Sequence, residues 1–280
     1  MSENELRSFI INALAEDTGD GDHSSLASVP AEAEGRARLL IKETGIISGL
    51  RVAREVFSVT DPSLRVEILL HDGDSVKYGD IALTVAGKVQ PILRAERLVL
   101  NIMQRMSGIA TSTALYTEKI SDTRARITDT RKTTPGMRTL EKEAVRTGGG
   151  VNHRMGLYDM IMLKDNHIDY AGGITAAIRR TKDYLHEKRL NLRIEVEARN
   201  IKEVREILEA GGIDRIMLDN FNIADTKEAV ALIAGRTETE SSGGITLENV
   251  RDYALCGVDY ISIGALTHHI KSLDMSLKAY

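Results

Sequence analysis

The chain has 280 residues, a net charge of -4 and 42% hydrophobic residues, values typical of a soluble globular protein with one large or two smaller domains. Aromatic residues make up 4% and tryptophan is absent, which argues against a stacking surface for nucleic acid. No apolar run approaches the roughly 18 residues of a membrane-spanning helix. The polar N-terminus lacks a signal-peptide pattern and the chain has a single cysteine, so we expect a cytoplasmic protein that binds neither membrane nor nucleic acid.

The first third of the chain mixes helical and strand-like segments. Apolar residues recur at helical spacing between positions 6 and 14, behind the capping-box pair Ser2 and Glu5, and predict an amphipathic opening helix. Strand-like runs at 38–42, 64–70 and 81–85 surround a helix near 50–57. Pro91 then begins a long apolar helix, which we interpret as the hinge between two domains.

After residue 124, predicted strands, loops and helices alternate along the chain. The strand candidates are 125–128, 160–163, 192–197, 215–218, 236–240 and 259–263. Such alternation specifies parallel strands joined by crossover helices, in a barrel or a doubly wound sheet. Every candidate ends in polar or glycine residues, and a barrel brings all its strand C-termini to one mouth. We therefore predict a barrel, and an incomplete one because six strands are recognisable where a closed barrel has eight.

Basic residues are concentrated between Arg124 and Lys164. This stretch carries nine Lys/Arg against four Asp/Glu, a local charge of +5 in an acidic chain. Because a polyanion-binding protein usually spreads such an excess over a whole domain, the confined cluster favours a pocket for a small phosphate or carboxylate ligand. We interpret four of its residues as solvated surface charges: Arg124, Arg126, Lys142 and Arg146.

Two glycine-containing strand ends predict a phosphate site. The sequence SSGG at 241–244 follows a strand and precedes a helix that we expect to start near Ile245. Glycines let the backbone approach an oxyanion, and helix-start N–H groups point toward it. Gly264 and Ala265 follow the last strand and can contribute in the same way from the neighbouring position.

Acidic residues lie at other strand ends. Glu195 and Glu197 share one face of a strand because side chains alternate with period two, and Asp219 ends the next strand. Carboxylates at the mouth suit magnesium held with a phosphate, ribose hydroxyls or a developing cation. Two alternatives stay open: either glutamate could take this part, and Glu195 could instead set the geometry of the basic residues.

Seven motifs, in one order, resemble those of the quinolinate phosphoribosyltransferase family. They are 129–138 (DTRKTTPGMR), 148–154 (GGGVNHR), 162–167 (MLKDNH), 195–197 (EVE), 218–221 (LDNF), 240–244 (ESSGG) and 264–268 (GALTH). The resemblance implies an N-terminal α/β sandwich domain over residues 1–110, to which residues 269–280 return, and an open, incomplete TIM-like α/β barrel over residues 111–268. It also implies a homodimer, able to assemble further, in which Arg97 is donated across the interface.

The resemblance implies a reaction and its residues. The nitrogen of quinolinate would attack phosphoribosyl pyrophosphate, pyrophosphate would leave, and decarboxylation would give nicotinate mononucleotide for NAD biosynthesis. Catalytic roles fall on Lys132, Lys164, Glu197 and Asp219, with the two acids holding magnesium. The implied substrate contacts are Arg97, Thr130, Arg131, Lys132, His153, Arg154, Lys164, Glu197, Asp219, Ser242, Gly243, Gly244, Ile263, Gly264 and Ala265.

Three other functions compete with this one. A molybdenum-associated homologue of the same family resembles the chain around Thr130 but typically lacks the run that contains Lys164. A sugar-phosphate aldolase would use Lys132 or Lys164 as a Schiff base. A non-enzymatic phosphoribosyl-nucleotide sensor would keep the phosphate loops, but it has no need of Lys164.

Overall fold

The computed structural model describes residues 2–280 and divides into two compact units. The first consists of residues up to 114 together with 139–149 and 269–280, and the second of 115–138 and 150–268. The prediction divided the chain at residue 110 and assigned all of 111–268 to the barrel. In the structure, residues 139–149 belong to the first unit instead. Each unit is therefore built from discontinuous stretches of chain.

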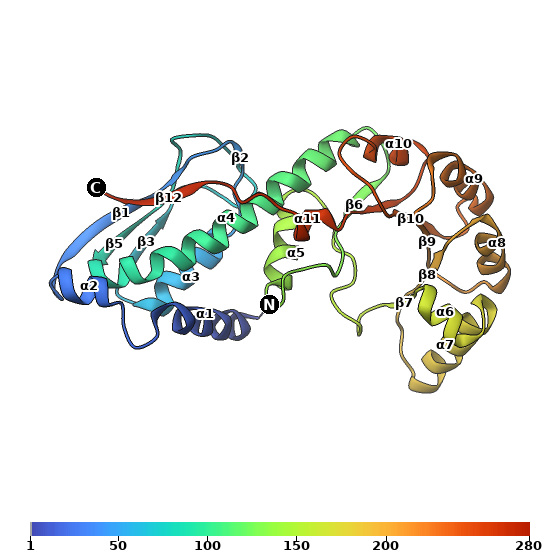
Figure 1. Cartoon of the computed structure of the whole chain (residues 1–280), viewed down its shortest axis with the longest axis horizontal. Helices are drawn as coiled ribbons and strands as arrows, with labels where there is room; N and C mark the ends of the chain where they lie inside the picture. Colours follow the sequence, from blue (N-terminus) through green and yellow to red (C-terminus); the bar gives the residue numbers. More distant parts are fainter. Residues whose placement is uncertain (1) are drawn as a thin grey trace. The chain divides into compact units, whose positions relative to one another are not determined.

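The first unit is built around a four-stranded antiparallel sheet in the order β12-β1-β5-β3 (Figure 1). Its core consists of alternate residues of β1 and β5, including Leu39, Ile41 and Val85, with the apolar face of α3. The elements of this unit are α1 (Glu3–Thr18), α2 (His23–Ser28), β1 (Glu34–Ile41), β2 (Gly45–Ile46), α3 (Leu50–Thr60), β3 (Arg65–Ile68), β4 (Ser75–Val76), β5 (Ile81–Lys88), most of α4 (Val89–Lys119), most of α5 (Arg138–Thr147) and β12 (Met275–Ala279).

The opening helix α1 begins as its capping box predicts. Ser2 Oγ accepts the backbone N–H of Glu5, and the Glu5 carboxylate accepts the N–H of Ser2. Each bond satisfies an N–H group that a helix start would otherwise leave without a partner. The helix buries Leu6 and Ile10 and packs on α3.

Ser107, Gly108 and Thr111 connect α4 to distant segments of the first unit. Ser107 Oγ accepts the N–H of Ser48 at 2.9 Å, and Thr111 Oγ1 accepts an N–H of β2 at 2.9 Å. A Cβ atom at Gly108 would lie 2.3 Å from the carbonyl oxygen of Lys271. Only glycine fits there, because real Cβ atoms essentially never approach so closely. The returning C-terminal segment thus passes directly over α4.

The second unit is an open α/β barrel, as the alternation of strands and helices predicts. Its six-stranded sheet is parallel throughout, in the order β6-β11-β10-β9-β8-β7, and α7, α8 and α9 lie on its outer side (Figure 1). The elements are β6 (Arg126–Thr128), β7 (Ile161–Leu163), α6 (Asp165–Ala171), α7 (Ile174–Lys188), β8 (Ile194–Ala198), α8 (Ile201–Ala210), β9 (Arg215–Asp219), α9 (Ile223–Ile233), β10 (Glu238–Ser242), α10 (Val250–Leu255), β11 (Tyr260–Ser262) and α11 (Ala265–His268).

The two faces of this sheet differ in chemistry because strand side chains alternate. Buried apolar residues on the outer face meet the helices; they include Ile127, Leu163, Val196, Ile216, Leu218 and Ile261. The inner face carries charged and hydroxyl residues in register: Thr128, Ser262, Ser242, Glu240, Arg215, Asp219, Glu195, Glu197 and Lys164. Since the opposite face supplies the apolar core, this polar lining is available for chemistry.

Two predictions about local structure were wrong. Lys142 is completely buried on α5 and is not a solvated surface charge. The helix after Gly244 begins at Val250 and not near Ile245, so a loop separates the two. The predicted return of residues 269–280 to the first unit is confirmed, because they include β12, which pairs with β1; the alternation of strands and helices alone does not reveal this long-range pairing.

Candidate active site

Asp129, at the end of β6, holds the two basic segments of the barrel mouth together. One carboxylate oxygen accepts the backbone N–H of His153 at 2.9 Å, and the other accepts Nδ2 of Asn152 at 2.5 Å. Arg131 and Lys132 follow Asp129 by two and three positions in the chain. One buried carboxylate therefore fixes 129–132 against 152–154, although the basic residues of these segments are more than 20 positions apart.

Arg154 and Arg131 form a pair of neighbouring cations. Arg154 is buried, and its Nη1 donates to the carbonyl of Met160 at 3.2 Å. Burial lowers the pKa of Arg154, and the nearby charge of Arg131 lowers it further. The charges of Glu195, Asp159 and Glu197 offset part of this repulsion, and a carboxylate or phosphate ligand bound to both guanidinium groups would offset more.

Two buried polar atoms near this pair also require a partner. Within the described residues, Thr128 Oγ1 and Arg131 Nε are buried and have no hydrogen-bond partner in the chain. A buried polar group without a hydrogen bond costs about 1–3 kcal/mol. A polyanionic ligand with several acceptor oxygens would satisfy both.

Lys164 lies at the mouth beside Glu197. Its Nζ atom donates to Glu197 Oε1 at 2.6 Å, and the other Glu197 oxygen accepts the N–H of Asp165 at 3.3 Å. The backbone N–H of Lys164 is bound by Nδ1 of His167 at 3.0 Å, which orients the start of α6. The Lys164 side chain is 43% exposed, so its ammonium group is both oriented and accessible to a ligand.

The strand ends of β9 and β10 meet at a glycine loop. A Cβ atom at Gly243 would lie 2.1 Å from Asn220 Oδ1, and the φ of +93° is one that side-chain-bearing residues rarely adopt. Asn220 itself has φ +57° and donates its N–H to the carbonyl of Ser242 at 2.8 Å. The loop at 243–244 thus presents bare backbone to the mouth, suitable for binding an oxyanion.

The next strand end, after β11, approaches Lys132. A Cβ atom at Gly264 would lie 3.1 Å from Cδ of Lys132, and Thr267 Oγ1 donates to the Lys132 carbonyl at 2.8 Å. The segment 264–267 and the basic segment at 131–132 are therefore neighbours at the mouth. This places an ammonium group beside the second glycine-containing strand end.

Glu197 and Asp219 are the residues at this mouth with the chemistry to hold magnesium. They come from the neighbouring strands β8 and β9 and lie on the same inner face. Asp219 accepts Nδ2 of Asn220 at 3.0 Å. Carboxylate oxygens are ligands that Mg²⁺ accepts, usually one or two from the protein with the rest from phosphate and water. These two carboxylates could hold the ion, and its binding stays a prediction.

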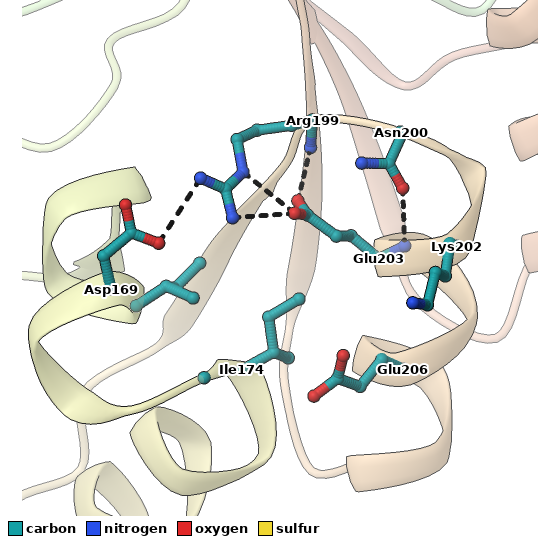
Figure 2. Close-up of a pocket in the computed structure, with 9 residues that line it drawn as sticks. Asp169, Ile174, Arg199, Asn200, Lys202, Glu203 and Glu206 are labelled. Atoms are coloured by element: carbon teal, nitrogen blue, oxygen red, sulfur yellow. Dashed lines mark hydrogen bonds and ion pairs between the residues drawn. The ribbon is translucent and has the colours of Figure 1, made fainter.

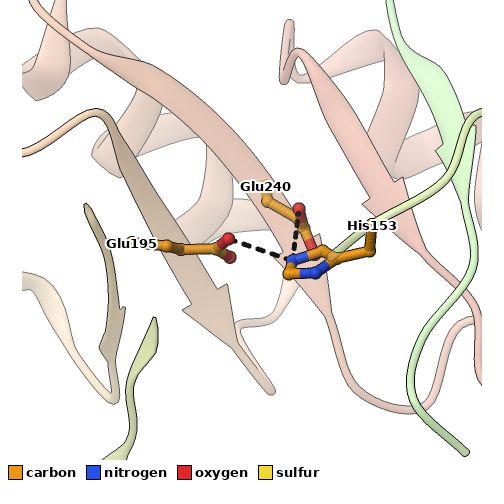
Figure 3. A group of neighbouring side chains, drawn as sticks. All are labelled: His153, Glu195 and Glu240. Atoms are coloured by element: carbon orange, nitrogen blue, oxygen red, sulfur yellow. Dashed lines mark hydrogen bonds and ion pairs between the residues drawn. The ribbon is translucent and has the colours of Figure 1, made fainter. Parts of the chain in front are cut away.

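Below the mouth, the barrel interior contains a cluster of buried charges, which we define as His153, Glu195, Arg215 and Glu240. Figure 3 shows His153 between the two glutamates, with its Nε2 3.0 Å from Glu195 Oε2 and 3.7 Å from Glu240 Oε2. Arg215 Nη1 donates to Glu240 at 2.6 Å, and its guanidinium lies over the Tyr260 ring at 3.8 Å. Burial raises the pKa of each glutamate to about 7, so this interior disfavours two full negative charges.

A separate cavity of about 260 Å³ lies on the outside of the same unit, between α6, α7 and α8 (Figure 2). Its charges pair among themselves: Arg199 binds Glu203 at 2.8 Å and Asp169 at 3.4 Å. Asn200 caps α8 by accepting the N–H of Glu203. This cavity contains none of the mouth residues, so its size does not make it the candidate site.

Most of the predicted site residues lie on the second unit, at or next to its strand ends. Lys132 is exposed there, Gly264 and Ala265 are half-buried, and Arg97 is an exposed residue of α4 in the first unit. Glu197 faces Lys164 at the mouth, whereas Glu195 lies deeper, against His153. The sequence reasoning did not single out Asp129, Arg215 or Glu240; a charged residue inside a strand was the available signal for the last two.

The fold and site together define a class of protein. An open α/β barrel combines glycine loops at two strand ends with paired arginines, a mouth lysine and two acids, as expected of an enzyme that binds a phosphorylated sugar and a carboxylate substrate.

Comparison with known proteins identifies the family. Residues 22–107 match the N-terminal domain, and residues 109–278 the C-terminal domain, of quinolinate phosphoribosyl transferase, so the chain belongs to this family. It is 48% identical to "Nicotinate-nucleotide pyrophosphorylase [carboxylating], chloroplastic" of Arabidopsis thaliana, over 98% of this chain and 82% of that protein. It is 40% identical to "Probable nicotinate-nucleotide pyrophosphorylase [carboxylating]" of Bacillus subtilis (strain 168), over 99% and 94% of the two chains.

A solved structure agrees with the fold. The crystal structure of NadC from Streptococcus pyogenes superposes with a TM-score of 0.94 at 38% identity, and the match covers 100% of this chain and 99% of that one. The predicted two-part α/β architecture and the predicted family are thus both confirmed.

Over the described residues, no helix is both long and apolar enough to cross a membrane.

Proposed function

We propose that the protein transfers the phosphoribosyl group of phosphoribosyl pyrophosphate to quinolinate and releases pyrophosphate and carbon dioxide, forming nicotinate mononucleotide for NAD biosynthesis. The observation that carries this proposal is the pair Arg131 and Arg154, close to Lys164, in a mouth that also has glycine loops. Three cations suit a substrate with two carboxylates, and the glycine loops suit a phosphate.

In the proposed complex, the cations and the loops take different parts of the substrates. Arg131, Arg154 and Lys164 bind the quinolinate carboxylates, and Lys132 is shared with pyrophosphate. Backbone groups of 242–244 and 263–265, with the Ser242 hydroxyl, bind the 5-phosphate, and Thr130 lies with the basic segment beside them. Both ring nitrogens of His153 bind within the chain, which argues against the direct contact with quinolinate that the resemblance implies.

The chemistry needs placement and charge more than proton transfer. The attacking pyridine nitrogen carries no proton, so the bond to the anomeric carbon forms without a general base. Glu197 and Asp219 face the cationic character that develops on the ribose, and Lys132 faces the departing pyrophosphate. Magnesium held by the same two acids would add positive charge next to the leaving group. Decarboxylation follows because the alkylated, cationic ring nitrogen stabilises the electrons left on the adjacent carbon.

We further propose a homodimer in which Arg97 of one subunit completes the site of the other, and a cytoplasmic location. The exposure of Arg97 on α4 supports the first proposal, and the single cysteine supports the second. The plant relative is named as chloroplastic, so location differs within the family.

The direct test is a paired assay of the purified chain. It is incubated with magnesium, phosphoribosyl pyrophosphate and either quinolinate or nicotinate, and nicotinate mononucleotide and carbon dioxide are measured. We expect product from quinolinate and none from nicotinate. Turnover of nicotinate, or trapping of a substrate adduct on Lys132 or Lys164 by borohydride, would contradict the proposal and favour another phosphoribosyltransferase or an aldolase.

Replacing Gly243 by alanine tests the phosphate loop. The new Cβ would clash with Asn220 Oδ1 at a backbone angle that alanine rarely adopts, so the loop must move. We expect the KM for phosphoribosyl pyrophosphate to rise about tenfold or more, as for loss of a charge-assisted bond, while quinolinate binding changes little. Gly235→Ala is a matched control, because its φ is +72° and no atom lies within 4 Å of the added Cβ. Equal effects of both variants would remove the loop from the phosphate site.

A further inference from the structure

The buried cluster of His153, Glu195, Arg215 and Glu240 has a bonding pattern that determines which nitrogen of His153 carries a proton. His153 Nδ1 accepts the backbone N–H of Arg154 at 2.8 Å. An acceptor nitrogen has no hydrogen of its own, so the ring proton is on Nε2. Nε2–H then donates to Glu195 Oε2 at 3.0 Å. The imidazole is therefore neutral, and its side chain is only 5% exposed.

The same three ligand atoms, one each from His153, Glu195 and Glu240, are close enough together to suggest a second metal site. The bonding argues against it. A metal on Nε2 would require the proton to move to Nδ1, where it would oppose the Arg154 N–H. The guanidinium of Arg215 already lies 2.6 Å from Glu240 and 3.9 Å from Glu195, so a cation is present between the carboxylates.

Arg215 is itself held in place from several sides. Its Nε and Nη2 atoms donate to Glu238 at 3.2 and 3.1 Å, and its guanidinium stacks on Tyr260. A planar guanidinium bound in this way is a fixed cation that can orient the carboxylates of Glu195 and Glu240. The register of the strands confirms the arrangement, because Arg215 lies directly opposite both Glu195 and Glu238.

We propose that Glu195, supported by Arg215 and Glu240, is a positioning residue that keeps His153 in the Nε2–H form, so that His153 Nδ1 holds the backbone of Arg154 where its guanidinium meets the substrate carboxylate. His153 then acts on the substrate through Arg154 and not as a direct ligand. This inference rests on the proposed function and assigns the support of its carboxylate-binding residues. It also assigns the two glutamates that the sequence could not distinguish: Glu197 lies at the mouth beside Lys164, and Glu195 positions the basic residues through His153.

The tautomer can be measured without any activity assay. The full chain, with ¹⁵N-labelled histidine, has seven histidines, and the His153 signals are assigned by their loss in His153→Asn. We expect nitrogen shifts of a single neutral Nε2–H tautomer at pH 7 in the wild type, and mixed tautomers in Glu195→Leu. A wild-type ring that carries a proton on Nδ1, alone or in addition to Nε2, would overturn the proposal.

Two amide variants separate the positioning role from direct binding. In His153→Asn, Oδ1 lies where Nδ1 lay and still accepts the Arg154 N–H, whereas in His153→Gln the amide reaches the Nε2 position and the Arg154 bond is lost. We expect the KM for quinolinate to stay within about threefold of wild type for His153→Asn and to rise about tenfold or more for His153→Gln. The KM for phosphoribosyl pyrophosphate should remain unchanged in both. The reverse order would show that Nε2 binds substrate directly.

Variants of the glutamates supply the matched control. Glu195→Leu should raise the quinolinate KM about tenfold, and Glu195→Gln, which still offers an acceptor oxygen, should restore most of the loss. Glu238→Gln removes a carboxylate from the same Arg215 but not from His153, so the quinolinate KM should not change. Equal effects of Glu238→Gln and Glu195→Leu would indicate a structural role only and overturn the proposal.

The result stays interpretable if one part fails. If Glu195→Leu does not fold, the tautomer of the wild type and the kinetics of the two His153 amide variants still test the proposal. If the wild type does not use quinolinate at all, the proposed function is wrong, while a single Nε2–H tautomer would still support the described bonding.

Discussion

Replacing Lys164 by alanine should reduce kcat/KM for quinolinate by about a hundredfold or more while the fold is kept, because a charge-assisted contact in a positioned site is lost. The Nζ atom is held by Glu197 at 2.6 Å and is accessible at the mouth, so it is oriented before substrate arrives. Removing it leaves Glu197 without its neighbouring ammonium group. Steady-state kinetics with each substrate varied in turn measure the effect, and circular dichroism checks the fold.

A lysine on the surface of the same unit provides the control for this variant. Lys188, at the end of α7, is 55% exposed and lies 4.0 Å from Glu187, so Lys188→Ala should leave both KM values and kcat unchanged. If Lys164→Ala behaved like Lys188→Ala, Lys164 would have no part in binding quinolinate. The main argument against the molybdenum-associated homologue would then be lost as well.

Mixing two inactive variants should restore activity if Arg97 serves the neighbouring subunit. Arg97→Ala and Lys164→Ala homodimers each lack a required group at both sites. In a mixed dimer the subunit that keeps Lys164 would receive Arg97 of the partner subunit, and one of its two sites would be intact. Because a twofold dimer exchanges residues reciprocally, random mixing of equal amounts should restore about a quarter of wild-type activity.

Subunit exchange must be shown independently, for example by mass spectrometry of differently tagged subunits. No recovery of activity after proven exchange would mean that Arg97 acts within its own chain or has no part in the reaction. The double variant Arg97→Ala with Lys164→Ala, mixed with wild type, measures how well mixed dimers form. Because a mixed dimer of wild type and double variant has no intact site, the activity should fall below that of the wild-type protein added.

Much of the barrel could be predicted because its signals are local. The six strand candidates were each found within about two residues of β6 to β11, and polar residues at their C-terminal ends correctly indicated one mouth. Lys164 could be selected because it directly follows an apolar strand, and Arg131 and Lys132 because they come within four residues of a strand end. The glycines at 243 and 264 were recognisable for the same reason.

Other features could not be read from local pattern. Lys142 looks like any basic residue of an exposed helix, yet α5 packs into the first unit and buries it. The strand β12 is short and follows a loop, and its pairing with β1 spans most of the chain. The link from Asp129 to His153 joins two motifs that the sequence keeps 24 positions apart.

By itself, the sequence determined the family, the strand–helix alternation and the set of charged groups at the strand ends, because these depend on residue type and short spacing. Only the tertiary structure decided which charges face each other. The register of β8, β9 and β10 turns Glu195 and Glu240 toward His153 and Arg215, and turns Glu197 toward Lys164. Two glutamates two positions apart share one face of a strand, but their neighbours come from other strands, and hydrogen-bond partners across a barrel are set by packing and not by local sequence.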